Sequence, residues 1–99
     1  MTEERIAESE LHRWRGDLSK ARDDQDAAEQ SYQRALAVAR RQSARSLEIR
    51  AATSFARLWR DQGKRTEARD LLAPVYGWFT EGFDTADLKE AKALIDELA

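Results

Sequence analysis

The sequence predicts an all-α protein in which antiparallel helix-turn-helix units stack as a short solenoid. The chain has one proline and four glycines in 99 residues and is rich in alanine, leucine, arginine and glutamate, a composition that favours helix nearly throughout. Apolar residues recur at every third or fourth position in five successive segments. The pattern also returns at an offset of 40 residues. We therefore expect one domain over residues 1–99, with five helices in about two and a half repeats.

The first helix is expected from about Thr2 to Arg22. A single apolar stripe runs along it, made of Ala7, Leu11, Trp14, Leu18 and Ala21. The segment DDQD then interrupts the pattern. Asp26 and Glu29 have the spacing of a capping pair, so the second helix is expected to begin there.

The second helix is expected to bury one apolar face, made of Ala28, Tyr32, Ala35, Leu36 and Ala39. The segment RRQSARS weakens the pattern next, and Ser43 or Ser46 is the expected cap of the third helix. That helix carries its apolar residues on one side, namely Ala52, Phe55, Ala56 and Trp59. Gly63 suits the left-handed backbone position that ends a helix.

Thr66 is expected to cap the fourth helix, whose apolar residues are Ala68, Leu71, Leu72, Val75, Tyr76 and Phe79. Pro74 falls inside this pattern and predicts a kink rather than an end. Gly77 and Gly82 loosen the chain afterwards. Thr85 starts a fifth helix, with Leu88, Ala91, Ile95 and Leu98 in line.

The 40-residue offset relates the helices to one another. It places Leu18 on Leu58 and Leu98, and Gly16 on Ala56. The second and fourth helices also align, with Ala28 on Ala68, Tyr32 on Leu72, Ala35 on Val75 and Ala39 on Phe79. The first repeat spans about 3–42, the second about 44–80, and a capping helix about 86–98. In such an array each helix pair buries its apolar stripe by stacking on its neighbour.

The segment FARLWRDQGKRTEARDLL resembles a tetratricopeptide repeat, through Ala56, Trp59, Gly63 and the Glu67-Ala68 pair. The resemblance implies that the first helix of each pair lines a concave groove. Two features depart from the family pattern. The spacing of 40 exceeds the usual period of about 34 residues. His12 and Ser19 also stand where aromatic residues are usual.

Most of the chain, from RSLEIRAATSF to KEAKALIDEL, resembles the C-terminal tail of large bacterial signalling proteins. Those proteins join an adenylate or guanylate cyclase domain and an ATPase domain to repeats of this kind. The resemblance implies a regulatory or scaffolding segment, because the chain contains neither catalytic part. It leads us to expect a non-catalytic protein-binding module that acts in signal transduction.

The stretch LLAPVYGWFTEGFD concentrates aromatic side chains near the end of the second repeat. We interpret the aromatic residues of this region as a structural cluster rather than a ligand site, with Trp59, Tyr76, Trp78, Phe79 and Phe83 as its members. Tyr76 and Phe79 share a helical face with Leu72. The fifth helix is expected to fold back over Trp78 and Phe79 as a terminal cap.

No pattern in the sequence demands chemistry. The segment DQGKRT has one glycine, too few for a phosphate-binding loop. His12 is the only histidine and there is no cysteine, so we expect no metal, no cofactor and no catalytic activity. A formal charge of −2 argues against nucleic acid as a partner. The absence of a long apolar run or a secretory signal leads us to expect a cytoplasmic protein that does not enter a membrane.

One polar pattern suggests a binding surface. Arg50, Arg57 and Arg60, with Thr53 among them, lie opposite the apolar side of the third helix. In the resembled family these positions line the groove, as Arg13 and Lys20 do on the first helix. Guanidinium groups in a row hold carboxylates well, so one hypothesis is a groove for an acidic peptide or for a helix of a partner protein.

Two alternatives stay open. The arginine face can be a solvated surface that is partly neutralised, since Asp61 follows Arg57 by four residues. The chain can also be a structural element that forms a homodimer. In that case the dimer buries the apolar side of the first helix, including Trp14, which otherwise lacks an upstream neighbour.

Overall fold

The computed structural model contains five α-helices. It describes residues 2–78 and 86–99 and, within these ranges, the side chains from residue 8 onward. The helices are α1 (Thr2–Ala21), α2 (Gln25–Arg41), α3 (Arg45–Asp61), α4 (Arg65–Gly77) and α5 (Ala86–Leu98). No strand occurs in these two ranges. The prediction of an all-α protein with five helices is confirmed. Among the described helices, none has both the length and the apolar character that a membrane crossing needs.

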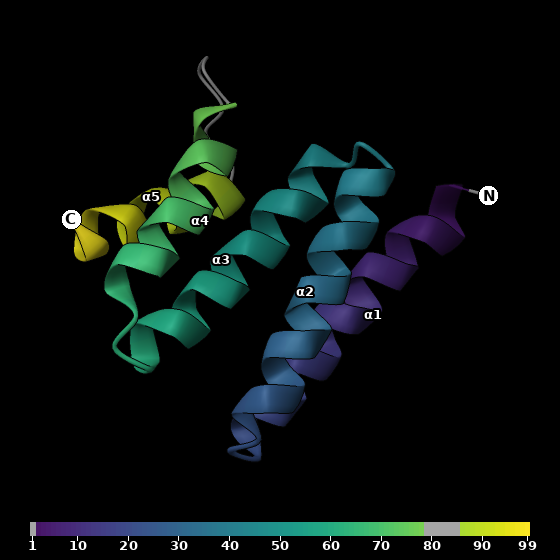
Figure 1. Ribbon diagram of the computed structural model, residues 1–99. Coiled ribbons are helices and arrows are strands. Elements are labelled where there is room, and N and C mark those ends of the chain that lie inside the picture. Colours follow the sequence, from purple (N-terminus) through teal and green to yellow (C-terminus); the bar gives the residue numbers. More distant parts are fainter. Residues whose placement is uncertain (1, 79–85) are drawn as a thin grey trace.

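Consecutive helices pack against each other in antiparallel fashion, and the odd-numbered helices are also in contact. Besides its neighbours α2 and α4, helix α3 packs against α1 and α5. Figure 1 shows the resulting order, with α1 and α2 at one end of the molecule, α3 across the middle, and α4 and α5 at the other end. Helix α3 is therefore the central element, and ten of its residues are buried.

The first three turns share one conformation at intervals of 20 residues. Asp23, Ser43 and Gly63 have φ angles of 63°, 54° and 82°, in the left-handed region. The residue that follows each of them donates its amide hydrogen to a carbonyl five positions earlier, as Lys64 does to Trp59 at 2.8 Å. Gly63 was expected in this role. The sequence indicated breaks at the other two turns, in DDQD and RRQSARS, but not their left-handed residue, because neither contains glycine.

The helix starts differ from the expected caps. Asp24, rather than Asp26, caps α2, and its carboxylate accepts a hydrogen bond from the amide of Ala27 at 3.2 Å. The N-cap residues of α3 and α4 are Ala44 and Lys64, and neither makes a side-chain capping bond. The left-handed turns already fix where these helices begin, so Ser46 and Thr66 lie inside them.

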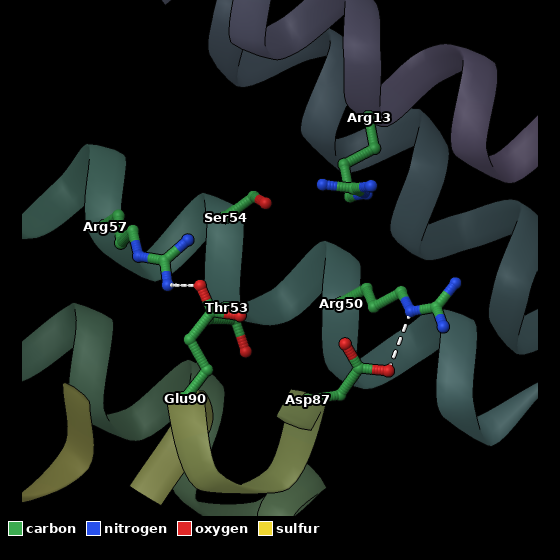
Figure 2. Close-up of a pocket in the computed structure, with 7 residues that line it drawn as sticks. All are labelled: Arg13, Arg50, Thr53, Ser54, Arg57, Asp87 and Glu90. Carbon is green, nitrogen blue, oxygen red and sulfur yellow. Dashed lines mark hydrogen bonds and ion pairs between the residues drawn. The ribbon is translucent and has the colours of Figure 1, made fainter. Parts of the chain in front are cut away.

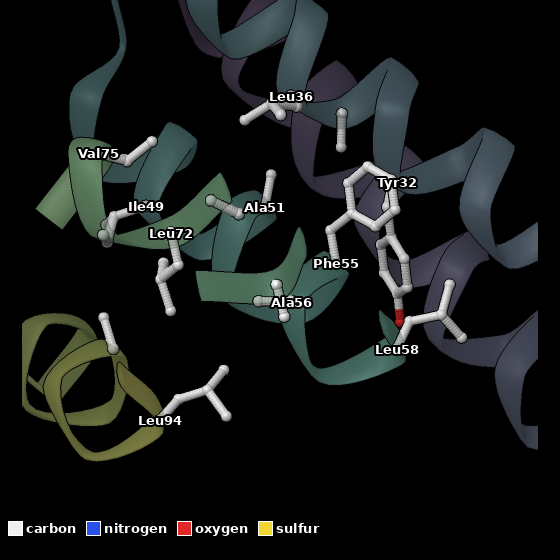
Figure 3. Packing of buried hydrophobic residues seen from close by; sticks show 14 of the residues in the cluster. Tyr32, Leu36, Ile49, Ala51, Phe55, Ala56, Leu58, Leu72, Val75 and Leu94 are labelled. Carbon is white, nitrogen blue, oxygen red and sulfur yellow. The ribbon is translucent and has the colours of Figure 1, made fainter. Parts of the chain in front are cut away.

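The expected apolar faces of α2 to α5 meet in one core (Figure 3). Tyr32, Phe55 and Leu72 are at most 3% exposed. Other expected core residues are fully or nearly buried, namely Ala28, Ala35, Leu36, Ala52, Ala56, Ala68, Val75, Leu88, Ala91 and Leu98. Leu94 belongs to this core as well, although the sequence analysis assigned Ile95 and not Leu94 to the apolar face of this helix. Trp59, Leu71, Tyr76 and Ile95 pack against it while partly exposed.

The apolar stripe of α1 is exposed. The accessible fractions of Leu11, Trp14 and Leu18 are 44%, 56% and 53%. Helix α1 instead turns toward the other helices a side that contains Ser9 and Gly16, both buried. The regular spacing of the stripe correctly predicts a helix, but no described part of the chain covers it.

Of the described members of the expected aromatic cluster, Trp59 and Tyr76 pack against the core, whereas Trp78 lies apart from it. Trp59 packs on Phe55, with ring centroids 4.3 Å apart, and donates from its Nε1 to Glu29 of α2. Trp78, expected beneath the fifth helix, is 47% exposed and carries the guanidinium of Arg45 at 4.8 Å from its ring. The other two members, at positions 79 and 83, lie outside the described residues.

Candidate functional site on α1, α3 and α5

A polar pocket of about 160 Å³ lies where α1, α3 and α5 meet. Its lining comes from all three helices and consists of Arg13, Arg50, Thr53, Ser54, Arg57, Asp87 and Glu90. Figure 2 shows Arg13 on one side, the α3 residues in the middle and the two carboxylates of α5 on the other side. Four of the six residues expected to line a groove are thus brought together: Arg13, Arg50, Thr53 and Arg57.

Arg50 bridges the two outer helices. Its Nε donates to Asp87 of α5 at 2.8 Å, and its Nη1 donates to Glu10 of α1 at 3.2 Å (Figure 2 draws the first of these bonds). The hydrogen bond to Asp87 raises the pKa of Arg50 above its usual value. Arg50 therefore acts as a tie between α1 and α5 across the pocket, and its guanidinium is already engaged by carboxylates.

The other two arginines of α3 also pair with α5. Arg57 forms an ion pair with Glu90, and Arg60 donates to Glu97 at 3.2 Å. We call Arg50, Arg57 and Arg60 the arginine row. Each member meets an acidic residue of α5, so the row is neutralised from within the chain.

The expected pairing of Asp61 with Arg57 is not found. Asp61 instead accepts from Lys20 of α1 at 2.9 Å and also pairs with Arg60. Burial acts to raise the pKa of Asp61, but the bonds from these two cations outweigh it and hold the pKa below its usual value. Lys20, an expected groove residue, therefore ties α1 to the end of α3 and does not line the pocket.

Arg13 is held on its own helix. Its Nε donates to Glu10 at 2.8 Å, and its Nη1 lies 3.7 Å from Asp17. Burial acts to raise the pKa of Glu10, but Arg13 and Arg50 together keep it below the usual range. Glu10 is thus a carboxylate shared between two guanidinium groups, and it fixes the α1 side of the pocket.

Two small polar residues form the floor of the pocket. Thr53 and Ser54 are 4% and 6% exposed. The hydroxyl of Thr53 donates to the carbonyl oxygen of Ile49 at 2.7 Å, one turn back in the same helix. The middle of this side of α3 is therefore buried between helices, while the side chains of Arg50, Arg57 and Arg60 stay partly exposed and are paired with acidic residues.

The sequence analysis missed the carboxylates of the site. Asp87, Glu90 and Glu97 follow one another by three and seven positions and so share one face of α5. This spacing is visible in the sequence, but α5 was interpreted through its apolar residues alone. The cations of the arginine row and these carboxylates together make a charged seam along α3 and α5.

A second pocket lies beside the turn between α2 and α3, with Arg40, Ser43, Arg45, Glu48 and Trp78 around it. Glu48 is 3% exposed and accepts from Arg40 of α2 at 3.0 Å. This buried carboxylate is therefore paired across the two helices. Its role in the described structure is to join α2 to α3.

The described residues contain no group of three or more histidine, cysteine or acidic side chains placed to hold a metal ion. Comparison with protein-family models, with curated proteins and with solved structures finds no significant match. The function must therefore be inferred from the surfaces described above.

Proposed function

We propose that this chain is a non-catalytic protein-binding module built as a tetratricopeptide-like stack of two helix pairs and a capping helix. The observation that carries the proposal is the pocket shared by α1, α3 and α5, the three helices that the 40-residue repeat relates. A pocket made by corresponding helices of successive repeats lies where a bound segment contacts every repeat at once. The resemblance to bacterial cyclase and ATPase signalling proteins supports a regulatory, cytoplasmic role.

The charges of the pocket define the partner that fits. An acidic peptide has to compete with Asp87 and Glu90, which already pair with Arg50 and Arg57. Charged pairs across an interface contribute mainly to specificity. We therefore infer a protein segment that carries both signs of charge, so that its acidic groups meet Arg13 and Arg57 while its basic groups meet the α5 carboxylates.

A peptide library displayed on phage tests this proposal. Binders selected on the wild-type chain are compared on two variants of similar charge change. Arg13→Gln with Arg57→Gln alters the pocket, whereas Arg69→Gln with Arg34→Gln alters exposed positions of α4 and α2. The proposal expects the binders to contain both acidic and basic residues and to lose affinity for the pocket variant only. Binders that tolerate the pocket variant as well as the control contradict it.

A further inference from the structure

Three positions of the apolar stripe on α1 have counterparts that are buried in both other odd-numbered helices. Leu11, Trp14 and Leu18, which we call the α1 stripe, are about half exposed. At offsets of 40 and 80 residues lie Ala51, Ser54 and Leu58 of α3 and Ala91, Leu94 and Leu98 of α5, and none of these is more than 6% exposed. Each of these two helices has earlier helices packed against it, since α3 contacts α1 and α2, and α5 contacts α3 and α4. The α1 stripe is thus the same surface without its covering helix.

The opposite end of the molecule has a polar outer surface. On α5 the side away from the core carries the exposed residues Lys92, Ala93 and Asp96, with an ion pair between Lys92 and Asp96 at 3.1 Å. A polar outer face is what a terminal element of a repeat array needs in water. The outer face of α1 is apolar instead. Half-exposed leucine and tryptophan side chains gathered on one helix face mark a surface for contact.

The charges around the α1 stripe indicate what covers it. Glu8 lies one turn before Leu11, and Arg22 lies one turn after Leu18. Both are exposed, and within the described residues neither takes part in an ion pair. Arg22 is still in helical register, because its amide donates to the carbonyl of Leu18 at 3.1 Å. The order along the helix is therefore acid, leucine, tryptophan, leucine, base.

We propose that the α1 stripe binds the α1 stripe of a second copy of this chain, with the two helices antiparallel about a two-fold axis near Trp14. Reversal of direction about that point places Leu11 opposite Leu18 of the second copy and brings the two Trp14 side chains together. It also places Glu8 beside Arg22 of the second copy, and the symmetry makes this ion pair twice. In a parallel arrangement about a two-fold axis, the flank that carries Glu8 and Arg22 lies on opposite sides of the seam in the two copies, so neither charge meets its complement. The charges of the stripe are therefore complementary in the antiparallel direction only.

One residue opposes the pairing. Arg15 is exposed and lies on the same flank as Glu8 and Arg22, near the axis, where it faces Arg15 of the second copy. The apolar contact is also short, with three half-exposed side chains per copy. An interface of this size belongs to the transient class. The dimer is therefore expected to form at high protein concentration and to strengthen when Arg15 is replaced by alanine.

The interface goes beyond the function proposed above, and the two are tested separately. The pocket residues Arg13 and Arg57 are not on the α1 stripe. Both binding events can therefore take place on one molecule, and failure of either leaves the other unaffected.

Sedimentation equilibrium over about 10 µM to about 1 mM protein tests the proposal. The variants are Glu8→Arg, Arg22→Glu and the double exchange that combines them. All change exposed residues, and circular dichroism checks that the helix content is unchanged. Each single exchange replaces two attractions by two repulsions and is expected to weaken the dimer by about tenfold. The double exchange restores the pairs and is expected to return the dissociation constant to within about threefold of the wild type.

Arg15→Ala is expected to change the dimer affinity in the opposite direction. It should lower the dissociation constant by about threefold, because it removes a like-charge contact. Two results overturn the proposal. The first is a wild-type chain that stays monomeric over the whole concentration range, because the stripe then does not bind a second copy. A dimer that the double exchange fails to restore is held together in another way.

Discussion

The ring of Tyr32 lies directly on the backbone of Gly16, and this contact sets how closely α2 approaches α1. A Cβ atom added at Gly16 would lie 2.5 Å from Cε1 of Tyr32, closer than any two such atoms pack. The tyrosine is 1% exposed and its hydroxyl donates to Asp17 at 2.5 Å, so the ring has no room to move. At the positions 40 residues later stand Ala56, which is larger than glycine, and Leu72, which is smaller than tyrosine.

Gly16→Ala is expected to destabilise the protein by about 1–3 kcal/mol, because the overpacking outweighs the gain of about 1 kcal/mol in helix propensity. The double variant Gly16→Ala with Tyr32→Leu copies the pair of the second repeat. Gly16→Ala is therefore expected to cost less stability in the Tyr32→Leu protein than in the wild type. Urea denaturation of the four proteins gives the coupling free energy. A coupling near zero contradicts the close contact.

Tyr32 also makes the free energy of unfolding decrease at alkaline pH. Burial, together with the hydrogen bond to Asp17, raises the pKa of the phenol well above its usual value of 10.0. The stability that the neutral phenol contributes is therefore complete below pH 10 and is lost as the pH rises above it. The expected slope is up to about 1.4 kcal/mol per pH unit.

Denaturation curves of the wild type and Tyr32→Phe between neutral pH and pH above 10 measure this slope. The phenylalanine variant keeps the ring and lacks the titrating group, so the difference between the two free energies of unfolding should shrink with rising pH. Parallel curves for the two proteins would show that the phenol is not held in its neutral form.

The turns before α2 and α3 place Asp23 and Ser43 where the third turn has Gly63. A residue with a Cβ atom pays about 1 kcal/mol for the left-handed conformation, which glycine adopts freely. Ser43→Gly is expected to stabilise the protein by about 0.5–1 kcal/mol, and Gly63→Ala to destabilise it by a similar amount. Thermal denaturation measures both. Loss of stability in Ser43→Gly contradicts the assigned turn conformation.

The arginine row holds α5 as well as lining the pocket. Reversal of Arg50, Arg57 and Arg60 to glutamate places three carboxylates against Asp87, Glu90 and Glu97 of α5. Because the wild-type pairs are partly exposed, we expect a loss of about 1–3 kcal/mol in the stability of α5 against local opening. Amide hydrogen exchange of residues 88–98 measures this loss.

A second variant that also changes the three α5 carboxylates to lysine restores opposite charges along the seam. Exchange in α5 is expected to return toward the wild-type rate, while exchange in α2 stays the same in all three proteins. Equal exchange rates in the wild type and the arginine variant would mean that the ion pairs do not hold α5.

The sequence predicted most of the fold because the helical spacing of apolar residues is a local signal. The apolar faces of α2, α3, α4 and α5 were recognised from this spacing before their neighbours were known. Whether a stripe is buried is not local. The α1 stripe has the same spacing as the others, and only the structure shows that no described helix covers it. The 40-residue alignment paired Gly16 with Ala56, and this small residue was a sequence signal for the close contact between Gly16 and Tyr32.

The site could be predicted in part. The cations of α3 were found because they stand on one face of a helix, but their partners come from α1 and α5, which requires knowledge of how the helices pack. Trp78 illustrates the same limit. Its place at the end of α4 suggested cover by α5, whereas it lies beside the start of α3, where Arg45 stacks on it.

The central claim is that positions related by the 40-residue offset in the sequence are covered in α3 and α5 and open in α1. Leucine occupies one such position in all three helices, as Leu18, Leu58 and Leu98, with exposed fractions of 53%, 1% and 4%. Each is changed to alanine, and the free energy of unfolding is measured by urea denaturation at low micromolar concentration. We predict a loss of about 2–5 kcal/mol for Leu58 and Leu98 and at most about 0.5 kcal/mol for Leu18. A loss for Leu18 as large as that for Leu58 would contradict the account.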